Sequence, residues 1–168
     1  MTTTSTTPEY GLKELQLETT FGGMGKETAR TIPLIDLSDF ENRRAEITEQ
    51  LWKAATEVGF FQLVNHGLDV KLVQSAFELS EAFFSLSNEQ KAAFPLKKGL
   101  NTGWEVMSQV RPSTRTADQK ESFQITLPHM DDLWPNQTLV PEFHRIMLDF
   151  EYRAWQLGMQ VLTCFAER

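Results

Sequence analysis

The sequence predicts a mixed α/β (α+β) domain that is rich in helix, with a few short strands and one long C-terminal helix. Three observations support this class. A helix, a strand and a helix meet at residues 58–67, apolar stripes with helical spacing recur along the chain, and the last stripe runs from Phe143 to Phe165. The chain has 168 residues, 40% of them hydrophobic, which suits one globular domain with a core of its own.

The composition argues against several functional classes. The net charge is -7 and the Lys and Arg residues form no cluster, so a nucleic-acid interface is not expected. No apolar run approaches the ~18 residues of a membrane span, and the N-terminus lacks the apolar region of a secretory signal. The single Cys164 fits a reducing compartment and is expected to be a packed thiol. We therefore expect a soluble, cytoplasmic protein.

The first elements follow from local signals. Residues 1–30 are Thr-rich and then Gly-rich, so we expect a flexible N-terminal segment. Residues 32–37 predict a short strand, and Ser38 with Glu41 predicts a capping box that opens a helix. Gly59 is expected to end that helix in a left-handed conformation. The apolar stripe of the helix consists of Ile47, Leu51, Ala54, Ala55 and Val58.

The next elements complete a crossover. Residues 60–64 are largely apolar without alternation, which predicts a strand buried on both faces. The order strand, helix, strand indicates a parallel pair. Asp69 is expected to cap a second helix, and residues 87–90 form another capping box. The short helix that it opens should end by Phe94, because Pro95 disfavours helical geometry in the residue before it.

Two further strands, at residues 103–110 and 121–127, precede a long helix that is expected to start at Pro141. No stop signal ends this helix before Arg168. Two explanations stay open and are about equally weighted: the chain is cut off from a larger fold, or the helix frays at the surface. The predicted apolar face consists of Phe143, Ile146, Met147, Phe150, Ala154, Leu157, Val161, Leu162 and Phe165.

The three histidines do not assemble a site in the sequence. His66 lies in a turn and is expected to bond to nearby backbone, and His144 lies at the surface of the long helix. His129 and Asp131 have the His-x-Asp spacing of an iron-binding facial triad. That triad also needs a second histidine from a distant strand, so we predict no metal ligands and no catalytic residues here. Trp104, beside a loop, is a candidate for contact with a ligand.

Several ordered motifs resemble one family. They are residues 32–37, residues 54–67 with their Asn65-His66-Gly67 turn, residues 83–91, Gly103-Trp104 and residues 118–123. Together they resemble the N-terminal region of the isopenicillin-N-synthase-like oxygenases, which depend on Fe(II) and 2-oxoglutarate. The resemblance covers roughly residues 31–168, including the long helix. It makes residues 31–168 a non-haem dioxygenase N-terminal domain that follows the flexible segment.

The resemblance implies a fold and a division of labour. The N-terminal part of such enzymes packs against a double-stranded β-helix, or jelly roll, which the long helix braces. The iron ligands and the Arg-x-Ser that holds 2-oxoglutarate come from that barrel, beyond the long helix, so the barrel is missing from this sequence. We therefore expect this chain to bind neither cofactor, whereas the full-length protein would bind Fe(II) and 2-oxoglutarate. By the same resemblance, Asn101 and Trp104 are candidate substrate contacts.

The predicted function is the N-terminal domain of an oxidoreductase that acts on a small organic substrate and is inactive without its barrel. The alternative is a non-catalytic interaction module. In that case the long apolar helix would pair with a second copy or with a separate barrel chain, because so long a stripe is unusual on a monomer.

Overall fold

The computed structural model describes residues 31–110 and 115–168, so the flexible segment expected at residues 1–30 lies outside the described residues. The described chain forms two compact units. One holds residues 31–104 and 123–168, and the other holds residues 105–110 and 115–122. Within these residues, no helix combines the length and the apolar composition needed to cross a membrane.

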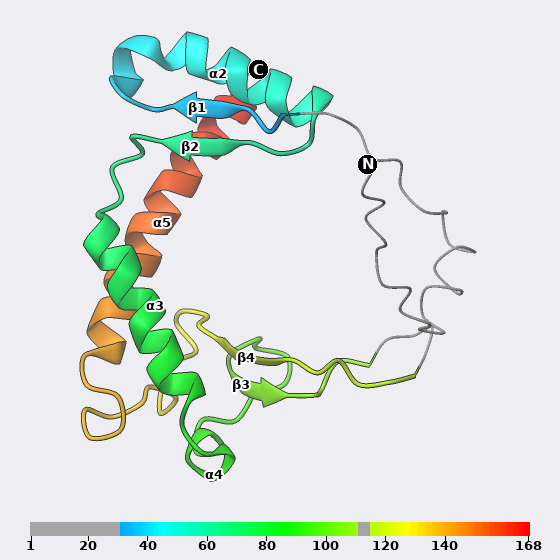
Figure 1. The fold of residues 1–168 in the computed structure, drawn as a ribbon, viewed down its shortest axis with the longest axis vertical. Helices are drawn as coiled ribbons and strands as arrows, with labels where there is room; N and C mark the ends of the chain where they lie inside the picture. The colour runs from blue at the N-terminus through cyan, green and yellow to red at the C-terminus, as the bar shows by residue number, and fades with distance from the viewer. Residues whose placement is uncertain (1–30, 111–114) are drawn as a thin grey trace, which may run out of the picture. The chain divides into compact units, whose positions relative to one another are not determined.

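Figure 1 shows the elements in chain order, coloured from blue to red. They are β1 (Leu34–Asp36), α2 (Phe40–Glu57), β2 (Gln62–Val64), α3 (Val70–Phe84), α4 (Asn88–Lys91), β3 (Gly103–Val106), β4 (Glu121–Gln124) and α5 (Phe143–Ala166). The predicted class, helix-rich α/β with short strands and a long C-terminal helix, is confirmed.

The crossover prediction is confirmed, because β1 and β2 pair in parallel with Ile35 opposite Leu63. The strand at 60–64 is not buried on both faces, however. Gln62 is exposed and Phe60 is 70% exposed. Among the described residues this sheet has two strands and its core lies on one face, so Phe60 and Gln62 remain in solvent.

The start of α2 corrects a prediction. Asp39 is the N-cap residue, with a φ of 50°, and no side-chain hydrogen bond caps the helix. The Ser38–Glu41 capping box is therefore wrong. The backbone N–H of Ser38 instead donates to Asp36 Oδ1 at 2.8 Å. The predicted end is confirmed, since Gly59 has a φ of 87° and its N–H donates to the carbonyl of Ala54 at 2.9 Å.

The other two predicted caps are confirmed. The Asp69 side chain accepts from the N–H of Lys71 at 2.9 Å at the start of α3. Ser87 and Gln90 form both bonds of a capping box at the start of α4. The helix α4 ends before Pro95, as expected.

The long helix α5 starts later than predicted, at Phe143 rather than Pro141, because Glu142 takes a left-handed conformation with a φ of 65°. Its inner face buries Phe143, Met147 and Cys164, so the packed thiol is confirmed. Leu162 was assigned to this face, but it is 59% exposed and the assignment is wrong. Leu162 follows Val161 by one residue, which turns it about 100° away around the helix.

Two apolar cores hold the larger unit together, and α5 contributes to both. The first core centres on Phe83 of α3, which is 0% exposed and contacts the rings of Phe94, Phe123 and Phe143. The second core joins β1 and α2 to the end of α5 through Ile35, Ile47, Leu51, Ala54 and Cys164. The helix therefore connects the crossover to the aromatic core.

Candidate functional site

The structure places the two predicted substrate contacts differently. Asn101 is exposed, has a φ of 52°, and accepts at its carbonyl from the Thr126 hydroxyl at 2.5 Å. Trp104 is only 9% exposed and belongs to the aromatic core. The Nζ atom of Lys91 lies 5.6 Å from the centroid of the Trp104 ring. Contact of either residue with a substrate stays a prediction.

A large concave feature of the described residues is an apolar groove of about 490 Å³ between α3, β4 and α5. Its polar members contribute little chemistry. The Ser80 hydroxyl donates to the carbonyl of Ala76 at 2.7 Å, and Glu151 is the ionisable residue among the described lining. The groove therefore offers carbon surface for packing rather than a set of reacting groups. Its aromatic lining consists of Phe83, Phe84, Phe123, Phe143, Phe150 and Trp155.

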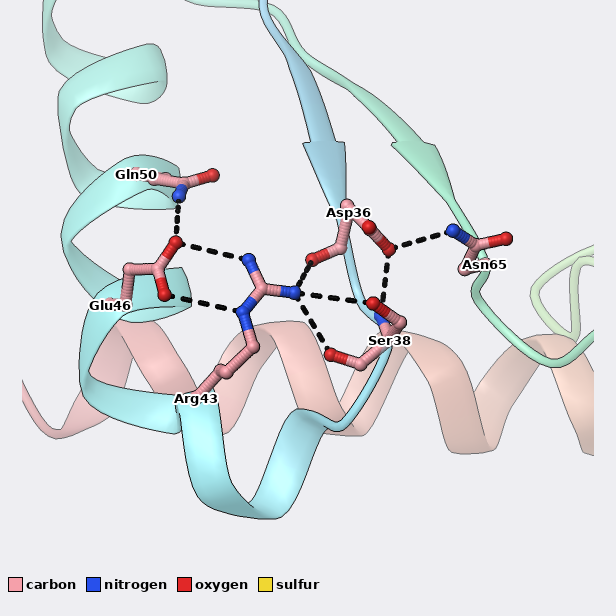
Figure 2. Close-up of polar contacts among 6 residues, drawn as sticks. All are labelled: Asp36, Ser38, Arg43, Glu46, Gln50 and Asn65. Carbon is pink, nitrogen blue, oxygen red and sulfur yellow. Dashed lines mark hydrogen bonds and ion pairs between the residues drawn. The ribbon is translucent and has the colours of Figure 1, made fainter.

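A polar network fixes the turn that follows β2, as Figure 2 shows. Asp36 Oδ1 accepts from the backbone N–H of Ser38 at 2.8 Å and from Asn65 Nδ2 at 2.8 Å. The Ser38 bond, and then the Asn65 bond, lowers the pKa of the Asp36 carboxyl below its ordinary value. Asn65, with a φ of 52°, is thereby tied to the end of β1 although 29 positions separate the two residues in sequence.

Arg43 closes the same network from α2 (Figure 2). Its Nη1 atom donates to the carbonyls of Asp36 at 3.2 Å and Ser38 at 2.9 Å. Its Nε and Nη2 atoms donate to the two carboxylate oxygens of Glu46, at 3.2 Å and 3.0 Å. This fork raises the pKa of Arg43 and lowers the pKa of Glu46. The network orders backbone at the surface and has the character of a structural clamp.

The turn histidine is also part of the scaffold. His66 Nδ1 accepts from the backbone N–H of Leu68 at 3.1 Å, which confirms the predicted bond to nearby backbone. In the smaller unit, Glu105 accepts from the hydroxyls of Ser108 and Ser122. The Ser108 bond is the main reason that the pKa of Glu105 is lowered. The sequence does not indicate either carboxylate cluster, because one partner in each, Asn65 for Asp36 and Ser122 for Glu105, lies 29 and 17 positions away.

The fold of the chain matches solved structures. It superposes on a full-length Neurospora crassa protein crystallised with alpha-KG, with a TM-score of 0.70 and 24% identity. That match covers 84% of this chain and 48% of the solved chain. The family model described as the N-terminal region of the non-haem dioxygenase in morphine synthesis matches residues 32–142. The chain belongs to this non-haem dioxygenase family.

Two curated relatives show how much of each protein the sequence match covers. The 2-oxoglutarate-dependent dioxygenase traH of Penicillium crustosum is 29% identical over 161 residues, which cover 84% of this chain and 49% of traH. A naringenin,2-oxoglutarate 3-dioxygenase of Arabidopsis thaliana is 36% identical over 144 residues, 81% of this chain and 39% of the relative. The chain thus spans about half the length, or less, of these non-haem dioxygenases.

Non-haem dioxygenases of this kind use Fe(II) and 2-oxoglutarate, and the described residues do not fit the metal. His129 and Asp131 are exposed loop residues. His144 stacks on Trp134 with a centroid distance of 4.2 Å. Within residues 31–110 and 115–168, no three His, Cys, Asp or Glu side chains form a group that could hold a metal ion. The His-x-Asp spacing is therefore not assembled into a facial triad by these residues.

Proposed function

We propose that this chain acts as the N-terminal domain of a Fe(II)- and 2-oxoglutarate-dependent dioxygenase, an oxidoreductase with a small organic substrate. The observation that carries the proposal is the family match over residues 32–142, combined with a match to only about half of each relative. Iron and 2-oxoglutarate are held by further polypeptide, a jelly-roll barrel that is either a continuation of this chain or a separate chain. The solved Neurospora crassa protein with alpha-KG and thymine supports a small substrate.

The apolar groove is the face on which we place that barrel. Trp155 at its edge is 56% exposed, and Phe84 and Phe150 are only partly buried. Six aromatic rings line the groove, so apolar surface that covers it stabilises the complex by about 25 cal/mol per Å² of buried apolar area. The domain's task is then to brace the barrel through α3, β4 and α5, while the Asp36–Arg43 clamp holds the crossover in place.

The first experiment measures 2-oxoglutarate turnover by the purified 168-residue protein with added Fe(II). We expect succinate formation no faster than without protein. The matched variants are His129→Ala, in the His-x-Asp pair, and His144→Ala, an exposed histidine on α5. Turnover that disappears in His129→Ala and persists in His144→Ala would contradict the proposal, since it would place a working metal site in the loop.

The second experiment measures the intact mass of the native protein and identifies chains that co-purify with it. We expect either a mass well above 19.3 kDa or a second chain that carries His-x-Asp, a distant His and Arg-x-Ser. A native mass of 19.3 kDa with no such partner would end the dioxygenase proposal for this polypeptide. Subcellular fractionation of the same source material, followed by detection of the protein in each fraction, tests the predicted cytoplasmic location.

Asn101 and Trp104 remain proposed substrate contacts in the assembled enzyme. They need different tests, because Asn101 is exposed and Trp104 is buried. The exposed Asn101→Gly variant, which keeps the positive φ of this position without strain, should raise KM for the substrate without loss of domain stability. Trp104→Phe should lower stability first, because Trp104 lies in the core at 9% exposure. An unchanged KM in a stably folded Asn101→Gly enzyme would remove Asn101 from the substrate site.

A second candidate function is a non-catalytic interaction module. The observation in its favour is the exposed outer side of α5, where Tyr152, Trp155 and Leu162 are each more than half exposed. Size-exclusion chromatography with light scattering tests this function by measuring the mass of the eluted protein. A monodisperse dimer favours the module, and polydisperse aggregation favours a domain that needs its barrel.

A further inference from the structure

The helix α5 carries a second apolar stripe in addition to the one in the core. It consists of Leu148, Tyr152, Trp155, Met159, Leu162 and Ala166, and we call it the outer seam. The spacings of four, three, four, three and four residues are those of a heptad repeat, the pattern by which helices pair side by side. Four of its members are 55%, 56%, 42% and 59% exposed, in the order Tyr152, Trp155, Met159 and Leu162.

The centre of the seam is already ordered. The rings of Tyr152 and Trp155 stack with a centroid distance of 6.5 Å and an interplanar angle of 19°. Gln156 Nε2 donates to the Tyr152 hydroxyl at 3.0 Å, which holds the tyrosine ring against the helix. An aromatic pair that is fixed before binding loses little side-chain freedom when a partner covers it.

Gly158 leaves room for a partner beside the outer seam. It lies in the interior of α5, where glycine lowers helix stability relative to alanine. A Cβ atom placed on Gly158 would meet nothing within 4 Å among the described residues, so no neighbour in the domain requires the missing side chain. Small residues beside an apolar stripe allow the backbone of a second element to approach closely.

We propose that the outer seam pairs with the outer seam of a second copy, with the two α5 helices antiparallel. This inference deepens the second function proposed above and rests on it. In the antiparallel register Trp155 lies opposite Met159 of the second copy, and Tyr152 lies opposite Leu162. Large rings then face smaller aliphatic side chains, and the tryptophan faces a thioether, a favourable contact. A parallel pair would instead oppose Trp155 to Trp155 and Tyr152 to Tyr152.

The exposed apolar area of the outer seam indicates how strong the dimer can be. Four large side chains at about half exposure uncover roughly 400 Å² on each copy. A stable interface buries ~800 Å² on each partner, so the seam supports a weak, concentration-dependent dimer rather than an obligate one. Gly158 lies one residue from the centre of the antiparallel register, at Leu157, where the helices would be closest.

Sedimentation equilibrium of the 168-residue chain at roughly 10 to 500 µM tests the proposal. The weight-average mass should rise from 19.3 kDa toward twice that value. Leu162→Lys should keep the mass at 19.3 kDa throughout, with an unchanged circular dichroism spectrum. The control is Phe77→Lys on α3, which replaces an equally apolar side chain, 70% exposed, that lies off the seam and should leave the dimer intact.

Disulfide trapping tests the orientation. If the helices are antiparallel, a mixture of the single variants Tyr152→Cys and Leu162→Cys should oxidise mainly to the mixed dimer, because positions 152 and 162 lie opposite each other. The native Cys164 is 0% exposed and should not compete for these disulfides. Disulfides formed mainly within each variant would overturn the antiparallel register. A dimer that persists in Leu162→Lys overturns the seam while the interaction module stands. A monomer at every concentration, or polydisperse aggregation, overturns both.

Discussion

The substitution Gly103→Ala tests how the aromatic core is closed. Gly103 has a φ of 99°, and a Cβ atom there would lie 2.4 Å from the carbonyl oxygen and 2.8 Å from the carbonyl carbon of Pro95. Both atoms belong to the backbone, so no side chain can rotate away. The approach exists because Trp104 N donates to the carbonyl of Phe94 at 2.7 Å and its carbonyl accepts from Leu96 N at 2.9 Å.

The expected loss has two parts. An alanine with positive φ costs ~1–2 kcal/mol whatever the space around it. Relief of the clash requires the Pro95 backbone to withdraw, which weakens both Trp104 hydrogen bonds at ~0.5–1.5 kcal/mol each and loosens Trp104 in the core. The sum is about 2–5 kcal/mol, a large share of the ~5–15 kcal/mol that holds a domain together.

Urea unfolding measures this loss, and Gly99→Ala is the matched control. Gly99 has a φ of 83°, yet a Cβ atom there meets nothing within 4 Å among the described residues. Gly99→Ala should therefore cost only the conformational term, ~1–2 kcal/mol. The difference between the two variants isolates the clash. Equal losses in the two variants would refute the close approach of residues 95 and 103.

Three further predictions concern the core and the clamp. Phe83→Ala should lower the free energy of unfolding by ~3–5 kcal/mol in urea titration, because the ring is 0% exposed among four other phenylalanines. Lys91→Met should cost about 1–3 kcal/mol, because Lys91 Nζ donates to the carbonyl of Phe84 at 3.0 Å and is buried; the exposed Lys71→Met should be nearly neutral. The pKa of Asp36 is lowered in the folded state, so the carboxylate stabilises the fold above pH ~4, and this stabilisation is lost as the pH falls through the folded pKa. When the urea midpoint is plotted against pH, Asp36→Asn should therefore reduce its fall at acid pH.

Local signals in the sequence predicted several helix boundaries, such as the end of α2 and the start of α3. Asp69 accepts from a backbone N–H two residues away and Gly59 donates to a carbonyl five residues away, so tertiary context rarely overrides these signals. Ser38 failed as a cap because nearby side chains bind its backbone groups. The Asp36 carboxylate takes the Ser38 N–H, and Arg43 takes the Ser38 carbonyl, so the residue is fixed outside the helix.

The candidate site was less predictable than the fold. The groove forms where Phe83, Phe123 and Phe150 meet, and these positions are separated by up to 67 residues in sequence. An apolar stripe indicates that a helix is covered, but it does not say by what. For the same reason Trp104 reads equally well as a ligand contact or as a core residue until its burial is known.

Helix α5 shows why two stripes were read as one. Successive residues of a helix are turned by about 100°, so Val161 and Leu162 cannot share the centre of one face. The sequence places apolar residues at both positions, and only packing separates them: Val161 contributes to the second core, whereas Leu162 is 59% exposed. A helix that is apolar on two faces and polar along only one flank has the pattern of an element covered from both sides. The inner face is covered by α2 and α3, and the outer seam is the part of that pattern for which a partner has still to be supplied.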